Sequence, residues 1–340
     1  MNVNMTKISK GVMMRLKQFI SAGCILFLNL WFINPSNSQA YPNRQIKMIY
    51  PFAAGSGADT AWRLLTLEAS KRLDQPIVFI NQPGANGRLA LDTVRRSEPN
   101  GYTLGIFTNG MLVVSPLIDP KNLSIEPGKD YIPVMVAIET PLVVAASSKA
   151  PFNHIAGMIS YAKAHPGKLT IGSAGSGSGS HLGIAMFGNK ADIEIVHVPY
   201  KGSGPALAAL LAGDIDAVFS DVGIKNYIEL GKAKGIAVSG IQRSTEIPSL
   251  PTLVEGGVSG AVYTTWMGVL TPIGTPPMVI QEINKAFASA LANPEVRAKL
   301  QSSGWSIKAD GASSDQAVQL IKRNLDLYRP IVESARMTFD

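Results

Sequence analysis

Short apolar runs rich in Val and Ile alternate with longer amphipathic stretches through most of this 340-residue chain. Short β-branched runs are typical of buried strands, whereas apolar residues that recur every three or four positions indicate helices. The first expected strands lie at 45–50, 77–80 and 102–107, and the first helices at 59–73 and 89–96. This alternation predicts an α/β protein with parallel sheets that are covered by helices.

The same rhythm resumes after residue 140. Expected strands follow at 142–146, 169–172, 195–198, 217–219 and 235–238, with helices at 155–164 and from His181 onward. Helices at 277–292, 294–302 and 314–333 close the chain. The last of these is expected to be interrupted at Pro330, because proline lacks the N–H that a helix interior needs.

Two sets of strands and helices indicate two lobes. We expect residues 41–141 and 266–340 to form the first lobe and residues 142–265 to form the second. The chain would leave the first lobe at 140–146 and return at 266–272. Two crossings around a hinge are what a clamshell binding protein requires.

Residues 1–40 have the layout of a secretory signal peptide. Four basic residues and no acid precede an apolar run at 19–33, and the segment ends in the small-x-small sequence Ser38-Gln39-Ala40. We predict cleavage after Ala40 and export to the periplasm. A retained anchor is the alternative, but the run has 15 residues and contains Asn29, whereas a spanning helix needs about 20 apolar residues.

Charge and cysteine content narrow the function classes. The formal net charge is +7, and four of these seven excess positive charges lie in the first 40 residues, so the basic composition does not indicate a nucleic-acid partner. The single cysteine, Cys24, precedes a further apolar stretch at 25–33, which argues against a lipoprotein signal. The mature chain would then have no cysteine, which suits an oxidising compartment.

A first glycine-containing loop, 51–59, joins an expected strand to an expected helix. Small residues let a ligand approach the main chain, and free N–H groups at a helix start attract anions. Ser56 is placed as the helix N-cap with Asp59 reaching back to it, and a well-capped helix after a tight turn is the alternative interpretation. The candidate ligand-binding residues here are Phe52, Ala53, Ala54, Gly55, Ser56 and Asp59.

A second loop, 171–181, has the same context in the second lobe and contains four glycines and four serines. A flexible linker is the alternative, but linkers rarely join a buried strand to an amphipathic helix within one lobe. We interpret it as a cradle of backbone amides and hydroxyls that faces the same cleft as the first loop. Its candidate residues are Ser173, Ala174, Gly175, Ser176, Gly177, Ser178 and His181.

Further candidates follow other strands, because ligands gather at the carboxyl ends of strands in α/β folds. Thr108 and Asn109 follow the strand at 102–107, and Pro199 and Tyr200 follow the strand at 195–198. Asp221, after the strand at 217–219, is also taken as a ligand-binding candidate. The neighbouring Lys201 is interpreted as a solvated surface residue.

Motifs of enzymes are missing from the sequence. It has no G-x-S-x-G, no phosphate-binding G-x-x-x-x-G-K-[ST] and no G-x-G-x-x-G, and its four histidines show no spacing that suits a metal. We therefore predict no catalytic residue, cofactor or metal. The rival hypothesis is an exported hydrolase that would use a serine of the 173–180 segment with His181.

The segments together resemble the Bug family, the TctC-like extracytoplasmic receptors of tripartite tricarboxylate transporters. The resemblance extends from about Tyr41 to Tyr328 and depends on the number and order of many short motifs. These motifs are Tyr41-Pro42, the 51–59 loop with Arg63, 81–85, 99–104, 162–167, 172–182, 197–202, 213–216, Pro251-Thr252 with 255–257, and Thr275-Pro276.

The resemblance implies a type II periplasmic-binding-protein fold that closes on a small carboxylate. Loops that match 52–56 and 173–178 would hold the carboxyl group through amides, hydroxyls and water. It also implies membrane transporter subunits as partners, a monomer and no nucleic acid, with sensing instead of uptake as an alternative use. Ser56 and Ser176 depart from the family pattern of Gly and Asn at those positions, so the chemical identity of the carboxylate stays open.

Overall fold

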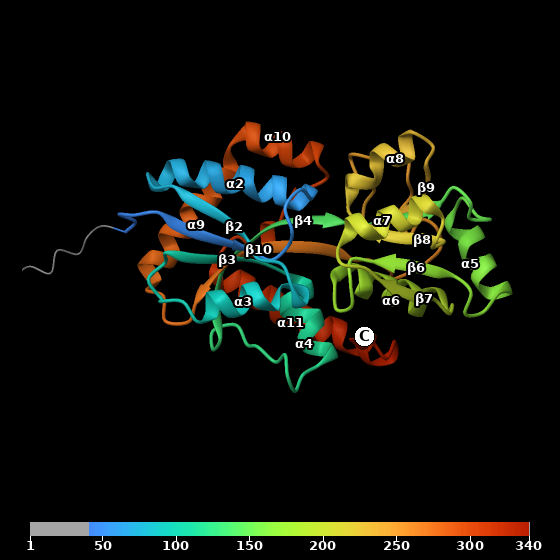
Figure 1. Ribbon diagram of the computed structural model, residues 1–340, viewed down its shortest axis with the longest axis horizontal. Coiled ribbons are helices and arrows are strands. Elements are labelled where there is room, and N and C mark those ends of the chain that lie inside the picture. The colour runs from blue at the N-terminus through green and yellow to red at the C-terminus, as the bar shows by residue number, and fades with distance from the viewer. Residues whose placement is uncertain (1–40, 340) are drawn as a thin grey trace, which may run out of the picture. The chain divides into compact units, whose positions relative to one another are not determined.

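The computed structural model describes residues 41–339, and the predicted signal peptide, its cleavage site and Cys24 lie outside these residues. Residues from Arg44 onward form one compact unit. Within this unit the strands form two separate sheets, one of six strands and one of five. We call the six-stranded sheet with its helices lobe 1 and the five-stranded sheet with its helices lobe 2 (Figure 1).

The sheet of lobe 1 has the strand order β11-β4-β10-β3-β1-β2. Strand β1 pairs in parallel with β2 on one side and β3 on the other, while β10 runs antiparallel to both β3 and β4. The bounds are β1 Ile46–Tyr50, β2 Ile77–Asn81, β3 Thr103–Thr108, β4 Tyr131–Pro141, β10 Thr264–Pro272 and β11 Ser306–Ile307.

The sheet of lobe 2 has the order β7-β6-β8-β5-β9. Strand β6 is parallel to β7 and β8, and β5 is antiparallel to β8 and β9. The bounds are β5 Val143–Ser147, β6 Thr170–Ser173, β7 Val196–Pro199, β8 Ala217–Ser220 and β9 Ala233–Val238.

The expectation of parallel sheets was therefore wrong, because both sheets are mixed. The antiparallel members have a topological cause. Only Leu142 separates β4 from β5, so the chain passes directly from one sheet into the other, and β10 brings it back. Most strands of each lobe run toward the junction between the lobes. A strand that has just crossed this junction runs away from it, and therefore in the opposite direction to those strands. The crossing strands β5 and β10 consequently pair antiparallel with their neighbours.

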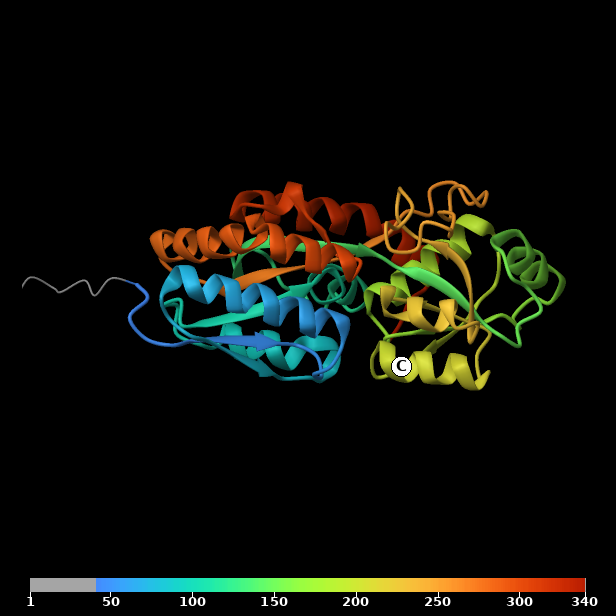
Figure 2. The same cartoon turned by 90° about the horizontal axis from the view of Figure 1, so that it is seen from above.

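Helices cover both faces of the lobe 1 sheet. Helix α2 packs beside α9 and α10, and Figure 2 shows α9 running alongside α2. Helices α3, α4 and α11 belong to a second group, in which α11 contacts β4, α4 and η3. The bounds are α2 Gly57–Leu73, η2 Ala85–Gly87, α3 Arg88–Arg95, η3 Gly110–Val114, α4 Ser115–Ile118, α9 Pro277–Ala292, α10 Pro294–Ser302, η5 Ala309–Gly311 and α11 Ser314–Ser334.

In lobe 2, helix α7 packs on β5, β6 and β8, while α6 contacts β6, β8 and, in lobe 1, α11. Helix α6 therefore contributes both to its own lobe and to the junction between lobes. The bounds are α5 Ile155–Ala164, α6 Gly179–Ala191, α7 Ser203–Ala212, η4 Val222–Ile224 and α8 Lys225–Glu229.

Helix α11 runs through Pro330, so the expected interruption there was wrong. Pro330 is on the exposed face of the helix, where the carbonyl group that loses its N–H partner faces water. On the opposite face Tyr328 and Val332 are buried, and Asn324 accepts a 2.7 Å hydrogen bond from the indole of Trp266. These contacts on both sides of the proline keep the helix continuous.

Candidate functional site

The carboxyl ends of strands β1 and β3 face lobe 2. Tyr50, the last residue of β1, lies close enough to Asp221, just after β8, for the Asp221 charge to help burial raise the pKa of the Tyr50 hydroxyl. After β3, a methyl group on the Cα of Gly110 would lie 3.2 Å from the Gly179 nitrogen and 3.3 Å from the Gly177 oxygen. Since β1 neighbours β3 and β6 neighbours β8, the loops after these strands border one crevice.

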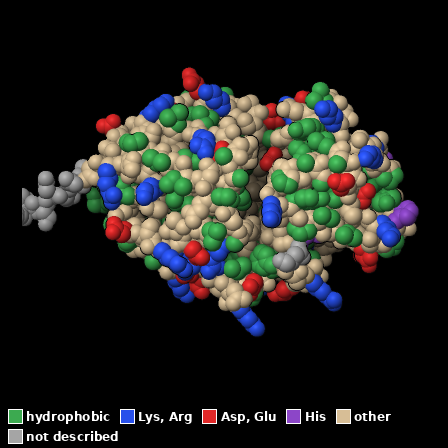
Figure 3. Space-filling view, in the orientation of Figure 1, with side chains coloured by type: hydrophobic (Ala, Val, Ile, Leu, Met, Phe, Trp, Pro, Cys, Tyr) green, Lys and Arg blue, Asp and Glu red, His purple; other side chains and the backbone are tan. Residues whose placement is uncertain are grey.

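The space-filling view shows the surface hollowed between the two lobes (Figure 3). At one place the lobes touch through small side chains: a methyl group on the Cα of Gly304, after α10, would lie 2.4 Å from Cγ1 of Val222, after β8. Val222 therefore fits over a glycine that has φ +76°.

The loop after β1 is built around a buried carboxylate. Asp59 is 4 % exposed, and its Oδ2 accepts hydrogen bonds from the Gly55 amide at 3.1 Å and from Nε of Arg63 at 3.0 Å. The side-chain amide of Asn81 donates to Asp59 Oδ1 at 3.1 Å and to the Phe52 carbonyl at 3.0 Å. Burial alone would raise the pKa of Asp59, but these donors together hold it below its usual value.

Ser56 is the N-cap of α2, as expected, and its Oγ accepts from the Asp59 amide at 3.1 Å. Asp59 reaches back one residue further than expected, to Gly55 instead of Ser56. The first two amides of α2, from Gly57 and Ala58, have no acceptor within the helix. A methyl group on the Cα of Gly57 or Gly55 would meet no atom within 4 Å, so this helix start is open to a ligand.

The loop after β6 is more closed. Its amides bond within the loop, from Ala174 to Ser180 Oγ at 2.9 Å, from Gly175 to Ser173 Oγ at 3.1 Å and from Ser178 to the Gly175 carbonyl at 3.1 Å. Ser178 caps α6 and accepts from the His181 amide at 3.2 Å. In lobe 2 the first amides of α6, from Gly179 and Ser180, are the ones without an intrahelical acceptor.

The side chain of His181 holds this loop through a hydrogen bond and a ring contact. Its Nδ1 accepts the Gly177 amide at 3.2 Å, and its ring stacks on His197 with centroids 3.8 Å apart and an interplanar angle of 9°. His197 in turn lies 2.6 Å from the hydroxyl of Ser173 through Nε2. Because Ser173 is 0 % exposed, this Ser–His pair has no access to a substrate and serves to hold the loop on the sheet.

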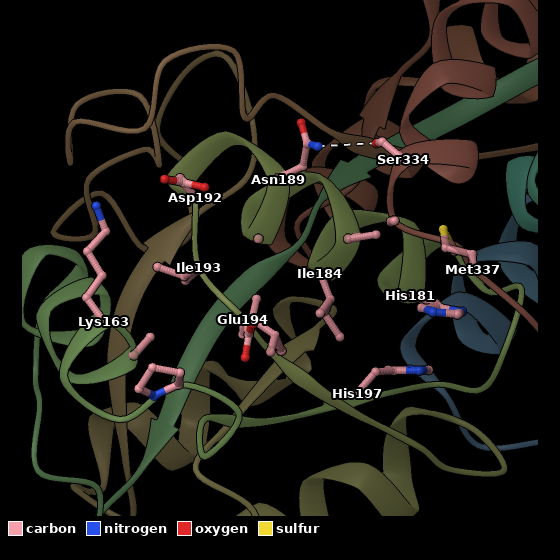
Figure 4. A pocket seen from close by; sticks show the side chains of 16 residues that line it. Lys163, His181, Ile184, Asn189, Asp192, Ile193, Glu194, His197, Ser334 and Met337 are labelled. Atoms are coloured by element: carbon pink, nitrogen blue, oxygen red, sulfur yellow. Dashed lines mark hydrogen bonds between the residues drawn. The ribbon is translucent and has the colours of Figure 1, made fainter.

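Both imidazoles line a pocket of about 680 Å³ between α5, α6, β7 and the end of α11. Figure 4 shows His181 and His197 at one end of this pocket and Lys163, Asp192 and Glu194 toward the other. The pocket lies behind the second loop. It is thus separate from the crevice that the two loops border.

Other predicted site residues have different surroundings. Asn109 is 0 % exposed, and its side-chain amide donates to the Tyr263 hydroxyl at 2.8 Å and to the Thr264 carbonyl at 3.0 Å, while Thr108 Oγ1 accepts from the Met111 amide at 3.2 Å. The Asn109 bonds tie the end of β3 to the strand that returns from lobe 2, whereas the Thr108 bond stays within the turn after β3. The structure thus gives both side chains partners within the protein.

Residues after β7 divide between the surface and the lobe 2 interior. Pro199 is exposed, whereas the ring of Tyr200 covers Gly172 and packs on the lobe 2 core. Burial raises the pKa of the Tyr200 hydroxyl, and the nearby charge of Asp214, which precedes β8, adds to this. The ring therefore runs back along the sheet, away from the carboxyl ends of the strands.

Asp221, just after β8, lies within electrostatic reach of Tyr50 of lobe 1. It is partly accessible to solvent, yet burial raises the pKa of its carboxyl group, as for a side chain on the wall of a cleft. Its Oδ1 accepts the Gly223 amide at 2.9 Å. Tyr50 and Asn81 also contribute to this region and were not among the predicted site residues. Their position as the last residues of β1 and β2 was the available signal.

Two adjacent lobes, each with strand ends and helix N-termini directed at one crevice, define a solute-binding protein of the periplasmic type. Within residues 41–339 no group of three or more metal-ligating side chains comes together. Nor does any helix in that range combine the length and apolar character needed to cross a bilayer.

Comparison with known proteins agrees with this class. Residues 61–337 match the family model described as the tripartite tricarboxylate transporter family receptor. A UPF0065 protein from the tcbD-tcbE intergenic region of Pseudomonas sp. strain P51 is 30 % identical over 320 residues, which is 94 % of each chain. The chain belongs to this TctC, or Bug, family of periplasmic solute-binding receptors, which are not enzymes.

Solved structures give the same result. The periplasmic binding protein BugD has a TM-score of 0.80 at 28 % identity, with 88 % of this chain and 100 % of BugD covered. MatC from Rhodopseudomonas palustris with bound malate has a TM-score of 0.78 at 30 % identity, covering 86 % and 100 %. A second R. palustris protein, with adipate, has a TM-score of 0.81 at 28 % identity, covering 88 % and 100 %. The predicted family, clamshell fold and receptor function are thereby confirmed.

Proposed function

We propose that this receptor binds a small organic carboxylate in the crevice between the loop after β1 and the loop after β6. The observation that carries the proposal is the open N-terminus of α2. Its Gly57 and Ala58 amides lack helix acceptors, and no atom lies within 4 Å of a methyl group on Gly57. Helix N-termini favour anions through their free N–H groups and their dipole.

The ligand class follows from the same site. Desolvating a carboxylate costs several kcal/mol in order of magnitude unless oriented amides replace its water. The open start of α2 is suited to do this, whereas the start of α6 is covered at Gly179 by the side chains of Tyr263 and Thr265, so on the lobe 2 side we infer a contribution from the loop that precedes α6. Relatives hold malate and adipate in their solved structures, so dicarboxylates are the first compounds to test.

The charge state of Asp221 determines which chemical groups of the ligand can lie beside it. An ionised carboxylate on the cleft wall repels a second carboxylate nearby, whereas a protonated Asp221 donates a hydrogen bond to it. We infer that the ligand places its first carboxylate at the start of α2 and an uncharged or hydrogen-bonding portion beside Asp221. A thermal-shift screen of mono-, di- and tricarboxylates, followed by calorimetry of the compounds that stabilise the protein, tests the class.

A pair of variants tests the position. Gly57→Asp introduces an anion at the first residue of α2, where acidic side chains suit the helix dipole, so the fold is expected to persist while carboxylate affinity falls more than tenfold. Met278→Asp places the same side chain in the first turn of α9, where Met278 is 80 % exposed. It serves as the matched control. Equal affinity of both variants and the unmodified protein would refute the site at α2.

We also infer that ligand binding closes the two lobes about the connections near 141–142 and 265–266. Because the ligand would contact both lobes, it would favour the closed arrangement. Small-angle scattering is expected to show a smaller radius of gyration with saturating ligand. An unchanged radius would count against closure.

Export and delivery complete the proposal. We infer that residues 1–40 direct export to the periplasm and are removed, and that the loaded monomer delivers its solute to the membrane subunits of a tripartite transporter. Mass spectrometry of the periplasmic protein is expected to find Tyr41 at the N-terminus. Loss of solute uptake on deletion of the receptor gene, with uptake restored by the plasmid-borne gene, separates transport from a role in sensing.

A further inference from the structure

The end of the chain lies on the second candidate loop. A methyl group on the Cα of Gly177 would lie 2.5 Å from Cε1 and 3.0 Å from Cζ of Phe339. The edge of the Phe339 ring therefore covers Gly177 directly. We call residues 337–339 the C-terminal tail.

The tail reaches the loop because of how α11 ends. Arg336 has φ 47°, in the left-handed region, and its amide bonds to the Glu333 carbonyl while the Met337 amide bonds to the Val332 carbonyl. These two bonds form the Schellman motif that turns a chain sharply away from a helix. Glycine is the usual residue at this position because other residues are strained there. The tail direction is thus set at one strained residue.

A second tail residue shares a pocket with the imidazole that holds the loop. Met337 is buried, and it lines the same pocket as His181, whose Nδ1 accepts the Gly177 amide (Figure 4). Phe339 covers the α-carbon of Gly177. Met337 lies in the pocket that the His181 imidazole also lines, and this imidazole accepts the hydrogen bond from the Gly177 amide. On the lobe 1 side, Ser115 Oγ lies 3.0 Å from the same methyl position. Gly177 is therefore enclosed by α4, the tail and His181.

We propose that the C-terminal tail positions the anion-binding loop of lobe 2. Gly177 has φ +74°, and its neighbours Gly175 and Ser178 close the turn that precedes α6. The tail limits this glycine-rich segment to the turn that holds the loop between lobe 1 and the start of α6. The identity of the bound group comes from the proposed function, whereas the positioning rests on the tail contacts alone. The family match ends at residue 337, so Phe339 lies beyond it.

Hydrogen exchange of the ligand-free protein tests the positioning without any ligand. In Phe339→Ala, the amides of residues 174–180 are expected to exchange about five-fold faster, because apolar cover over the loop is lost. The amides of β8 are expected to keep their exchange rates. A general loss of stability would instead raise the exchange rates of β8 as well. Phe339→Leu retains apolar cover and is expected to restore most of the protection.

The controls lie on the same helix and its end. Leu327→Ala removes an exposed apolar side chain of α11, and it is expected to leave loop exchange unchanged. Arg336→Gly permits the same turn and is expected to preserve the protection, whereas Arg336→Val disfavours the left-handed conformation and is expected to reduce it. Loop exchange that is equal in Phe339→Ala and the unmodified protein, or a rise that includes β8 equally, overturns the proposal.

Calorimetry with malate and adipate as probes separates this inference from the proposed function. Where the unmodified protein binds a probe, Phe339→Ala is expected to weaken the affinity about five-fold at an unchanged Tm, in line with its exchange. An affinity that stays the same while the loop exchanges faster overturns the role of the tail in binding. If no carboxylate binds the unmodified protein, the proposed function fails, and the exchange data alone decide whether the tail positions the loop.

Discussion

The side-chain amide of Asn109 donates a 2.8 Å hydrogen bond to the hydroxyl of Tyr263 and so joins the end of β3 to the segment that returns from lobe 2. Both residues are almost fully buried. Asn109 also donates to the Thr264 carbonyl and accepts from the Gly110 amide. The junction of the lobes is therefore fixed by a buried polar contact.

Tyr263→Phe is expected to lower the free energy of unfolding by about 1–3 kcal/mol, because a buried donor of Asn109 loses its acceptor. Urea unfolding at neutral pH measures this change. Tyr227→Phe, in α8, is the matched control, since Tyr227 is only partly buried. Equal unfolding curves for Tyr263→Phe and the control would show that the contact does not stabilise the junction.

Asp59→Asn is expected to destabilise the protein at neutral pH by about 1–3 kcal/mol. Gly55 and Arg63 both donate to Oδ2 while Asn81 donates to Oδ1, so an amide that keeps the first two bonds turns its own NH2 group toward the Asn81 donor, and the charge that pairs with Arg63 is lost. The pKa of Asp59 is lowered in the folded protein. Its carboxylate thus stabilises the fold above the unfolded pKa near 3.8, and that stabilisation is lost as the pH falls through the lower folded pKa. The difference between variant and unmodified protein should therefore shrink in strong acid.

Asp92→Asn is the control for Asp59, because Asp92 pairs with Arg88 at the same spacing of four residues but has a side chain that is 27 % exposed. Ion pairs that water reaches contribute less than about 1 kcal/mol. Similar losses for Asp59→Asn and Asp92→Asn at neutral pH would contradict a structural role for the buried carboxylate.

Asp221→Asn is expected to raise Tm at neutral pH. Burial raises the pKa of Asp221 in the folded protein, so the folded state favours the protonated form. The stabilisation that protonated Asp221 gives to the folded state is fully present below the unfolded pKa near 3.8, and it is lost as the pH rises through the folded pKa. The gain in Tm from the variant should hence appear at neutral pH and vanish in acid. A gain that is the same at every pH would point to a cause other than charge.

Gly110→Ala is expected to weaken ligand binding by pushing the lobes apart. The added methyl group would lie 3.2 to 3.4 Å from the backbone of residues 177–179, so that backbone has to move by a few tenths of an ångström. Gly204→Ala, in the first turn of α7, serves as the control, since a methyl group there meets nothing within 4 Å and, as at Gly110, the φ angle lies outside the left-handed region. Scattering and calorimetry should show a larger radius and lower affinity for Gly110→Ala alone.

The helices were well predicted from periodicity, and α9 and α10 have the expected bounds. Strand β4, the longest strand within residues 41–339, was predicted only at its end. Pro133 and Pro141 argue against a central strand, and no local pattern shows that β4 pairs with the distant β10. The antiparallel pairs were missed for the same reason, because the direction of a crossing strand is a property of the whole chain path.

Some features of the candidate site could likewise be predicted from the sequence, and others could not. The two loops follow strands and precede helices in the sequence, so their position at strand ends could be predicted. The partners of Asn109, the direction of the Tyr200 ring and the bonds within residues 174–178 depend on residues far along the chain or on the exact turn. Composition alone suggested a loop of free amides, whereas its serines satisfy several of them.

The fit of Val222 over Gly304 has a consequence for how fast the receptor exchanges its solute. If the lobes part at this place, the Val222 side chain leaves its contact with Gly304, and the apolar surface of both residues becomes exposed to water. This exposure would add to the free-energy barrier for release of the solute. A residue that shortens this side chain would therefore speed departure of the solute and weaken its affinity together, because the lost contact would stabilise the closed arrangement and not the open one.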